Sequence, residues 1–512
     1  MAMSTAKTFS AQTTGLKTEI ISVEIDISNG LNSFSIVGMG DRAVAEAKDR
    51  ISAAIKNTGY TSPKQKNQKV VISLAPADIR KEGPSFDLAM AIGYLKACGE
   101  IIFETEGKLF LGELSLLGEI KQTNGILPIL CDAKNMGFIQ AFIPEQNKNE
   151  ASLAKDIEIY TVSSLKQFID HISGQKPLNK VTGIRKIESN TISTNIDMSS
   201  IRGNENIKRG LEIAAAGAHN VIMCGPPGTG KTMLAQSFVT LLPELTQEQC
   251  IEVTSIHSIA KTLRENLITN PPFRSPHHTA SYPSIVGGGN SPKPGEITLA
   301  HRGVLFLDEL PEFDQKVLEA LRQPLEEKSI TISRARGSVT FPAQCILIAS
   351  MNPCPCGKGP TKGCECPNHI IDAYKRRISG PITDRIDIWL NVEKVDYDKL
   401  SMKSSSGEKS SAIASRVKNA RLIQEKRFSN SKNNNTNKYF NSEMNAEDIE
   451  KLISMSEEAR NTLTKTAERF QLSGRSFHRL IKVSQTIADL AGSHIIENNH
   501  VLEAIQYRQK SL

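Results

Sequence analysis

Residues 225–232, GPPGTGKT, place three glycines ahead of a lysine and a threonine, a spacing suited to binding phosphate groups. An apolar run, NVIMC, precedes this loop and MLAQSF follows it, so strand, loop and helix come in that order. Backbone N–H groups and the helix N-terminus then surround the phosphates, Lys231 reaches the β and γ oxygens, and Thr232 ligates Mg²⁺. An ordinary glycine-proline turn before a helix is the alternative. The proposed nucleotide-binding residues are Gly225, Pro226, Pro227, Gly228, Thr229, Gly230, Lys231 and Thr232.

A second apolar strand, residues 303–307, ends in the carboxylates Asp308 and Glu309. A buried parallel sheet delivers such charges to its carboxyl edge, where a nucleotide binds. Asp308 would hold the Mg²⁺ shell and Glu309 would polarise the attacking water, because phosphoryl transfer depends on positioning and charge neutralisation. Alone, an acidic pair after a strand is as often a helix cap. Together with residues 225–232, it predicts a magnesium-dependent ATPase.

Four of the nine cysteines lie in one glycine- and proline-rich loop, spaced as C-x-C, seven residues, then C-x-C. Four thiolates can surround one tetrahedral ion, which predicts a structural Zn²⁺ with no open position for catalysis. Zinc ribbons use wider spacing within each pair, so free thiols or a redox pair remain alternatives. The four candidate ligands are Cys354, Cys356, Cys364 and Cys366.

The elements that must position these residues form an α/β core over residues 207–395, flanked by further domains. Apolar, β-branched runs at 220–224, 303–307 and 344–350 alternate with helical segments, which predicts a mainly parallel sheet. A polar linker is expected at 176–206. Residues 396–512 are predicted to be helical, with one helix around 413–427, further helices from Ala446, and loops at 404–411 and 429–437.

Residues 1–175 are predicted to form a separate α/β domain. Alternating apolar residues predict strands, and a helix with an inward apolar stripe begins at the cap Asp41 and ends at Gly59. The predicted strands lie within 18–37, around a turn at Asn29-Gly30, and at 70–74 and 109–118, with a helix over 87–98.

Composition excludes several classes of protein. The chain has 512 residues, 39% hydrophobic and 23% charged, and no apolar run approaches the roughly 18–20 residues of a membrane span. The first fifteen residues lack an apolar secretory segment, so we expect a cytoplasmic protein without membrane association. Its net charge of +7 is compatible with a polyanionic partner but is spread along the chain.

Beyond these patterns, the sequence resembles the AAA+ ATPases and specifically the magnesium-chelatase-like ComM/YifB family, over nearly the whole chain. The motifs that carry the resemblance are RKEGPSFDLAMAIG (80–93), GPPGTGKT (225–232), PHHTAS (276–281), GEITLAHRGVLFLDELPEF (295–313), MNPCPCG (351–357), SGPITDRID (379–387) and GRSFHRLIKVSQTIADL (474–490). The resemblance implies an N-terminal domain similar to the Lon protease domain (ribosomal S5 domain 2-like), an AAA+ core with a helix-2 insert, a C-terminal helical lid and a homo-hexameric ring.

The resemblance also implies further catalytic residues. Asn352 matches sensor 1, which orients the lytic water, although a solvated loop asparagine is the alternative. Arg385 matches the arginine finger that completes a neighbouring subunit's site, and Arg475 matches sensor 2, a role that Arg479 could fill instead. Surface salt bridges are the alternative for these arginines.

One further segment is expected to belong to the insert, and another is expected to contact DNA. Residues 273–295, with His277 and His278 and the glycines 287–289, match the place of the insert. The predicted hairpin 330–341, with Arg334 and Arg336 near its tip, resembles the pore hairpin of related helicases, and its charges could track a phosphate backbone. Ordinary surface charge, and a structural role for the histidines, are the alternatives.

Ser85 lies in GPS, which resembles the nucleophile segment of Lon-type proteases. The Lon mechanism uses a lysine that corresponds here to Leu127, and leucine cannot deprotonate a hydroxyl. Unless Lys81 or Lys121 substitutes, Ser85 is structural.

The resemblance implies a DNA motor, a helicase that drives branch migration on single-stranded or branched DNA during natural transformation. The alternatives are a magnesium-chelatase ATPase subunit that serves metal insertion into a porphyrin, an ATP-dependent Lon-like protease or chaperone, and a scaffold without hydrolysis.

Overall fold

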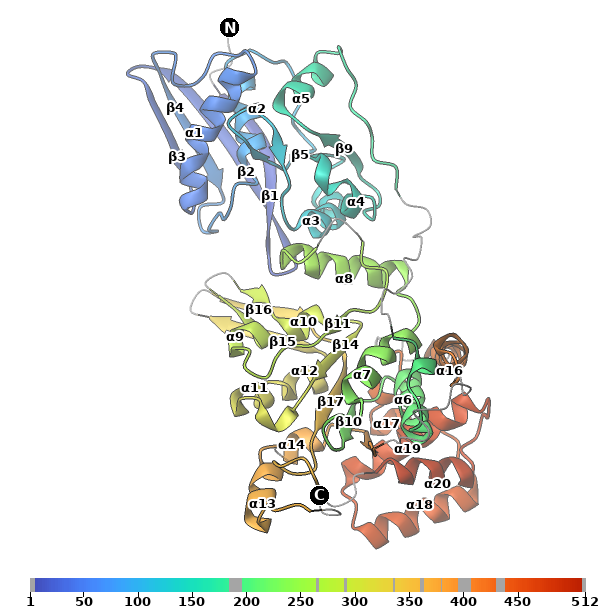
Figure 1. Cartoon of the computed structure of the whole chain (residues 1–512). Coiled ribbons are helices and arrows are strands. Elements are labelled where there is room, and N and C mark those ends of the chain that lie inside the picture. The colour runs from blue at the N-terminus through green and yellow to red at the C-terminus, as the bar shows by residue number, and fades with distance from the viewer. Residues whose placement is uncertain are drawn as a thin grey trace. The chain divides into compact units, whose positions relative to one another are not determined.

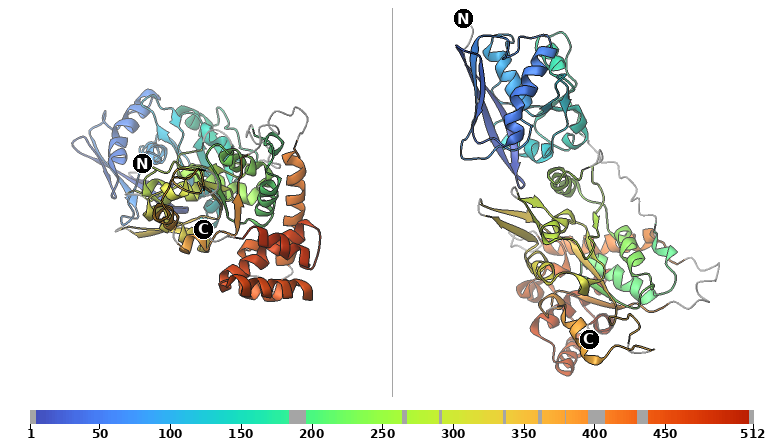
Figure 2. Two further views of the ribbon diagram at one scale, coloured as in Figure 1. Left: turned by 60° about the horizontal axis from the view of Figure 1, so that its bottom comes forward. Right: turned by 60° about the vertical axis from the view of Figure 1, so that its left-hand side comes forward.

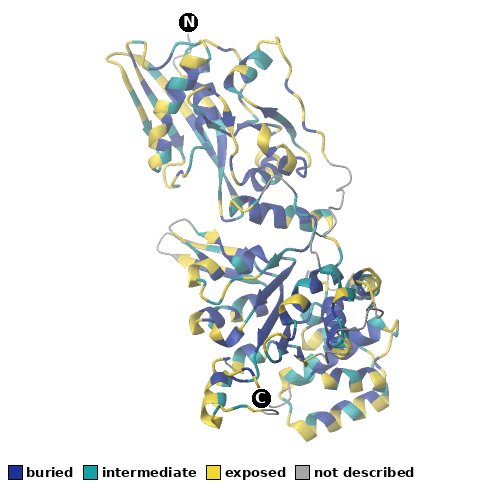
Figure 3. Ribbon diagram, in the orientation of Figure 1, coloured by how far each residue is buried: buried dark blue, intermediate teal, exposed yellow. Residues whose placement is uncertain are grey.

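The computed structural model describes residues 5–183, 196–263, 267–289, 292–334, 337–359, 363–378, 380–394, 407–429 and 438–508 (Figure 1). Two compact units emerge from the contacts within the chain. Unit 1 comprises residues 1–188, 247–268 and 290–294, and unit 2 comprises residues 189–246, 269–289 and 295–512. Each unit has its own buried core, drawn in dark blue in Figure 3. No helix in these described ranges is both long enough and apolar enough to cross a membrane.

The first sheet of unit 1 has four strands in the order β1-β2-β4-β3. These are β1 (Thr5–Thr14), β2 (Lys17–Asn29), β3 (Ser33–Val37) and β4 (Gln68–Ala75). The predicted strands around Asn29-Gly30 are confirmed as β2 and β3, but they do not pair with each other because β4 lies between them. Strand β1, which the sequence did not predict, pairs with β2 over ten residues.

Two predicted helices of unit 1 are also confirmed. Helix α1 (Arg42–Asn57) begins after Asp41, whose side chain accepts a hydrogen bond from the Val44 N–H. Helix α2 (Asp87–Ala97) is buried over nearly its whole length and packs on β1 and β2. The two helices cover one face of the four-stranded sheet in Figure 1.

The prediction of one strand over 109–118 is wrong. The chain forms β5 (Lys108–Phe110), breaks at Gly112, forms β6 (Glu113–Leu114) and turns at Gly118, which has a φ of +83°. β5 joins a parallel sheet with β8 (Gln140–Pro144) and β9 (Glu158–Val162), whereas β6 pairs with β7 (Ile120–Lys121). Apolar alternation shows which residues are buried but does not show that one run is shared between two sheets.

Unit 2 is built on a five-stranded sheet in the order β11-β14-β17-β10-β18, and every pairing in it is parallel. The strands are β10 (Val221–Cys224), β11 (Phe273–Arg274), β14 (Val304–Leu307), β17 (Ile346–Met351) and β18 (Ile388–Asn391). β14 and β17 are buried along their whole length, as continuous apolar runs in a covered parallel sheet should be. The predicted α/β core with a mainly parallel sheet is confirmed.

The segment predicted as the insert, residues 273–295, is divided differently. Phe273 and Arg274 form the edge strand β11 of the five-stranded sheet, so the segment begins inside the core. Helix α8 (Gln247–Ile259), which precedes it in the chain, packs in unit 1 against α3 (Ile126–Ala133). Within unit 1, the Ser258 hydroxyl donates to Glu150 at 2.7 Å and accepts from the Gly125 N–H at 2.9 Å.

The C-terminal part of unit 2 is helical, as predicted. Helices α6 (Glu205–Gly217), α16 (Ser410–Ser429) and α19 (Gly474–Leu490) pack against one another, and α6 also contacts β18. In the left view of Figure 2, the C-terminal helices of this unit appear as a red cluster. The other elements are α4 (Lys148–Ala151), α5 (Leu165–Ile172), α7 (Lys231–Phe238), α9 (Tyr282–Val286), α10 (Glu296–Leu299), α11 (Gln315–Ala320), α12 (Arg322–Glu327), α13 (Asn368–Arg376), α14 (Gly380–Thr383), α17 (Ala446–Leu452), α18 (Glu457–Phe470), α20 (Asn498–Gln506), β12 (Gly287–Gly288), β13 (Lys293–Pro294), β15 (Ser329–Arg334) and β16 (Gly337–Pro342).

Candidate nucleotide-binding site

The carboxyl ends of three adjacent strands bring the predicted site residues together in unit 2. β17 lies between β14 and β10, with Leu307 paired to Ala349 and Cys224 paired to Met351. The residues that follow these ends are the glycine-rich loop after β10, Asp308 after β14 and Asn352 after β17. Parallel strands therefore place loop, carboxylate and amide at one edge.

Lys231 is held at the centre of the loop. Its Nζ donates to the carbonyl oxygens of Gly225 at 2.6 Å and Pro226 at 2.9 Å, and to the Asn352 Oδ1 at 3.2 Å. Burial lowers the pKa of Lys231, although the charges of Asp308 and other neighbours oppose the shift. The loop keeps its tight curve through Gly228 and Gly230, whose φ values are +75° and +86°.

Asp308 and Thr232 place two oxygen atoms side by side, with the Thr232 Oγ1 donating to the Asp308 Oδ2 at 3.1 Å. Oxygen atoms of this kind are the ligands that Mg²⁺ prefers, so the pair fits the predicted metal. The buried Ser350 hydroxyl donates to the other carboxylate oxygen of Asp308 and accepts from the Glu309 N–H at 3.3 Å. Sequence reasoning missed Ser350, whose only signal is a polar residue near the end of an apolar strand.

Glu309 has a left-handed backbone with a φ of +53°, and its side chain is half exposed. The His278 Nδ1 lies 3.5 Å from the Glu309 Oε2, and the His278 ring is tilted by 33° to the His277 ring at a centroid distance of 4.2 Å. Of the two histidines that the resemblance placed in the insert, His278 thus lies beside the candidate catalytic carboxylate.

The three candidate arginines gather around residues 380–387. Arg385 is 9% exposed, donates to the Pro381 carbonyl and forms an ion pair with Glu326. Arg475 is 66% exposed and lies 3.9 Å from the same Glu326 carboxylate. Arg479 is more buried than Arg475, and it donates hydrogen bonds to the carbonyls of Thr383 and Ile386. The structure brings Arg385 and Arg475 to one carboxylate, and it fixes Arg479 on the backbone.

The predicted hairpin exists as β15 and β16, in register from Ser329 opposite Pro342. One face buries Ile330, Ile332 and Phe341. The other face carries facing hydroxyl pairs, 3.0 Å apart between Thr331 and Thr340 and 2.9 Å apart between Ser333 and Ser338. Arg336 and the Arg334 side chain lie outside the described residues.

In unit 1, Ser85 is half-buried, and the two lysines named with it have other partners. Lys81 is buried, donates to the Pro76 carbonyl, and has its pKa lowered by that burial. Lys121 forms an exposed ion pair with Glu119 at 2.6 Å.

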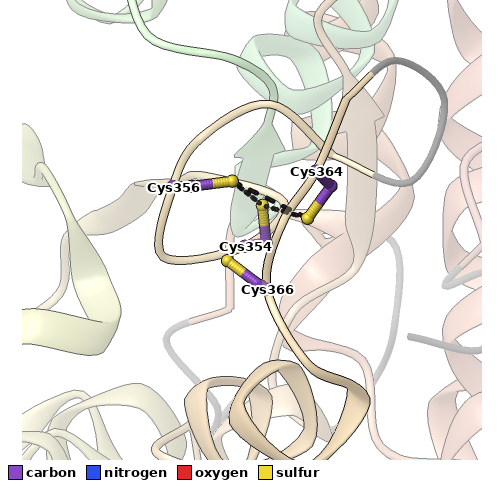
Figure 4. A group of neighbouring side chains, drawn as sticks. All are labelled: Cys354, Cys356, Cys364 and Cys366. Atoms are coloured by element: carbon purple, nitrogen blue, oxygen red, sulfur yellow. Dashed lines mark hydrogen bonds between the residues drawn. The ribbon is translucent and has the colours of Figure 1, made fainter.

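The four loop cysteines converge in unit 2 (Figure 4). Their Sγ atoms all lie within 4.8 Å of one another. The separations are 3.3 Å between Cys354 and Cys356, 3.7 Å between Cys356 and Cys364, and 3.6 Å between Cys364 and Cys354. A hydrogen bond from the Lys358 N–H lowers the pKa of Cys356 to about 6. Although backbone hydrogen bonds oppose the shift, the neighbouring thiols and burial raise the pKa of both Cys364 and Cys366. Four converging sulfur atoms are a donor set that suits a soft divalent metal.

Comparison with known proteins adds three family models that together cover most of the chain. The model described as magnesium chelatase, subunit ChlI, matches residues 197–400. A model of subunit ChlI of Mg-chelatase matches residues 23–147, and one of its C-terminal region matches residues 407–508.

Individual relatives extend over the full length. The competence protein ComM of Haemophilus influenzae is 39% identical over 511 residues, which are 99% of this chain and 98% of that protein. The protein YifB of Escherichia coli is 38% identical over 500 residues, covering 96% and 95%. The DNA replication licensing factor mcm2 of Xenopus tropicalis is 27% identical over 168 residues, covering 30% of this chain and 17% of that protein.

Proposed function

We propose that this chain, which belongs to the magnesium-chelatase-like ComM/YifB family of AAA+ ATPases, is a cytoplasmic, ring-forming motor that hydrolyses ATP to move DNA. The observation that carries the proposal is the convergence of Lys231, Thr232, Asp308 and Asn352 at one sheet edge. Phosphoryl transfer requires this set of a cation, metal-binding oxygens and a polar group that positions water.

Each residue of the site has a distinct part. Lys231 exchanges its carbonyl partners for the β and γ phosphate oxygens, and the loop N–H groups bind the same phosphates. Thr232 and Asp308 would hold Mg²⁺, which would neutralise charge on the phosphates. Glu309 accepts the proton of the attacking water and Asn352 orients that water. Ser350 holds Asp308 and the Glu309 backbone in place.

We propose a hexameric ring because Arg385 matches the arginine finger of the family. In its own chain its guanidinium contacts Pro381 and Glu326, and not the phosphate loop. A finger that acts across a subunit boundary would complete the neighbour's site, where it could stabilise charge in the transition state. Arg475 joins the same cluster and is the proposed sensor 2.

DNA as the partner is supported by the relatives, which are named for competence and for DNA replication. It is also supported by the β15–β16 hairpin, whose exposed face carries Thr331, Ser333, Ser338 and Thr340. The sequence places Arg334 and Arg336 between these two pairs. Hydroxyl groups and arginines bind phosphate oxygens without reading the sequence of bases. We propose branch migration during natural transformation as the activity.

The test measures ATP hydrolysis and oligomeric state with no DNA, with single-stranded DNA, and with a four-way junction. The proposal expects junctions to raise turnover and to be unwound in an ATP-dependent way, and expects Lys231→Ala to abolish both. Thr331→Ala/Thr340→Ala should retain basal ATPase activity but lose part of the DNA stimulation. Unchanged turnover and oligomeric state with every DNA would refute the motor.

A second candidate is favoured by the family models, which are all of magnesium chelatase. In this role the ATPase would drive insertion of a metal into a porphyrin together with partner subunits. An insertion assay with porphyrin, Mg²⁺, ATP and those subunits decides between the two, because a DNA motor produces no metalloporphyrin.

A further inference from the structure

The loop between β17 and α13 lacks the side chains that normally hold a loop in place. Residues 353–369 contain no Val, Ile, Leu, Met, Phe, Tyr or Trp. A segment of 17 residues that buries no such side chain cannot offset its loss of conformational entropy by hydrophobic burial. Among its described residues, an exposed ion pair between Lys358 and Glu365, at 3.8 Å, joins the two arms, and pairs of this type contribute little.

The cysteines supply what the loop otherwise lacks. A tetrahedral zinc ion with Zn–S bonds of about 2.3 Å holds its sulfurs about 3.8 Å apart. The three separations of 3.3, 3.7 and 3.6 Å come near this value without an ion. The Gly359 N–H donates to the Cys354 Sγ at 3.3 Å, the kind of outer bond that supports a metal-bound thiolate. A cluster of several iron atoms would spread the four sulfurs farther apart.

The same loop contacts the phosphate loop. Gly357 lies so close to Pro227 that a Cβ atom at Gly357 would come within 2.7 Å of the Pro227 Cδ. At the start of the segment, Asn352 bonds to Lys231, and the Met351 carbonyl accepts from the Gly225 N–H at 3.1 Å. The cysteine loop is therefore joined to the phosphate loop at both of these points.

We infer that Cys354, Cys356, Cys364 and Cys366 hold one structural Zn²⁺ ion, and that this ion fixes the loop as a brace that positions Pro227 and Asn352. The four thiolates close the coordination sphere, so the ion has no catalytic position. The residues act as positioning residues, and the effect on nucleotide binding rests on the proposed ATPase function. The inference that the metal is present does not rest on that function.

The metal is tested first on the whole purified chain. Elemental analysis should find one zinc per chain, and replacement by Co²⁺ should give the visible absorption of a tetrahedral thiolate site. Cys356→Ser/Cys364→Ser should lose both signals. Cys98→Ser/Cys131→Ser, which changes two cysteines of unit 1, should keep them.

Several results would overturn the zinc site. These are wild-type protein without stoichiometric zinc, an iron–sulfur absorption spectrum, a disulfide among the four cysteines, or zinc retained by the double variant. Alkylation of the native wild-type chain tests the site without any mutation. The four loop thiols should be protected until a chelator removes the metal, and reaction before chelation contradicts the proposal.

The brace is tested with two glycine variants. Gly357 and Gly363 have nearly equal φ values of +77° and +73°, so alanine strains the backbone equally at both. Only Gly357 faces Pro227, since a Cβ at Gly363 meets nothing within 4 Å. Both variants should retain zinc, and Gly357→Ala should weaken binding of a fluorescent ADP analogue at least about tenfold relative to Gly363→Ala. Equal affinities would overturn the brace and leave the metal result standing.

Discussion

Replacing Lys231 with methionine tests whether the lysine charge serves nucleotide binding or the stability of the fold. In the protein without nucleotide, the ammonium is desolvated and bonds to the Gly225 and Pro226 carbonyls and to Asn352. Methionine removes a buried charge but leaves carbonyls without their donor, each effect being on the order of 1–3 kcal/mol. Because the two effects oppose each other, unit 2 should unfold at nearly the same temperature in the variant.

Nucleotide should then distinguish the two proteins. At Mg·ATP about 100 times the wild-type Kd, binding adds about 2.7 kcal/mol to the stability of the native state. Unit 2 has about 300 residues, and unfolding entropy of about 2.1 cal/mol/K per residue gives about 0.6 kcal/mol per degree. Wild-type protein should therefore gain about 4 °C.

The variant should gain less than about 1 °C under the same conditions. Losing two charge-assisted bonds to phosphate, each worth about 1.5–3 kcal/mol, raises the Kd by at least about 100-fold. Differential scanning calorimetry with a slowly hydrolysed ATP analogue measures both shifts. Lys465→Met, which changes an exposed lysine on α18, is the matched control and should behave as wild type.

Two outcomes would refute this reasoning. If the variant gained the full shift, Lys231 would not bind the phosphates. If the variant without nucleotide lost more than about 3 kcal/mol, the ammonium would be a structural group whose bonds outweigh its desolvation.

Three further predictions address other residues. Glu309→Gln should bind ATP with nearly wild-type affinity, measured by equilibrium titration, yet turn over at least about 100-fold more slowly, because an amide cannot accept the proton of water. Arg385→Ala should leave affinity nearly unchanged and lower turnover about 10³-fold. Mixed rings with wild-type subunits should lose activity in proportion to the number of interfaces affected, and a loss confined to variant subunits would contradict the finger. In unit 1, Arg50→Met leaves the buried Asp87 without its partner at 2.7 Å and should cost about 3–5 kcal/mol in chemical denaturation. Arg42→Met, on the exposed side of the same helix, should cost less than about 0.5 kcal/mol.

The nucleotide site could be found from sequence because its residues are adjacent in the chain to strands. Residues 225–232 and Asp308 follow apolar runs, and a parallel sheet brings the ends of such runs to one edge. The contacts between those residues and others could not be found in this way. Ser350 and His278 touch Asp308 and Glu309 only because strands distant in sequence pair with one another.

The secondary structure, too, could be predicted where its signals are local in the sequence. The helix beginning at Asp41 was found from its cap and apolar stripe, which are local signals. Strand β1 carries Thr8 and Ser10 on its buried face, where apolar residues mark most strands, so it lacked the usual pattern. No local pattern in residues 247–268 identifies their packing partner, and the structure groups this segment with unit 1.

The two cations proposed to act on phosphate share one property that sequence does not reveal. Lys231 rests on two carbonyl oxygens and Asn352, and Arg385 rests on a carbonyl oxygen and Glu326. A cation that binds phosphate in a dry site must lose its water, and these partners take the place of that water before the ligand arrives. In the proposed motor, nucleotide binding and ring assembly would each exchange one set of partners for another. The affinity for phosphate depends on the free-energy difference between the two sets of partners. A change that weakens the resting partners of either cation should therefore raise this affinity, as stronger contacts with phosphate would.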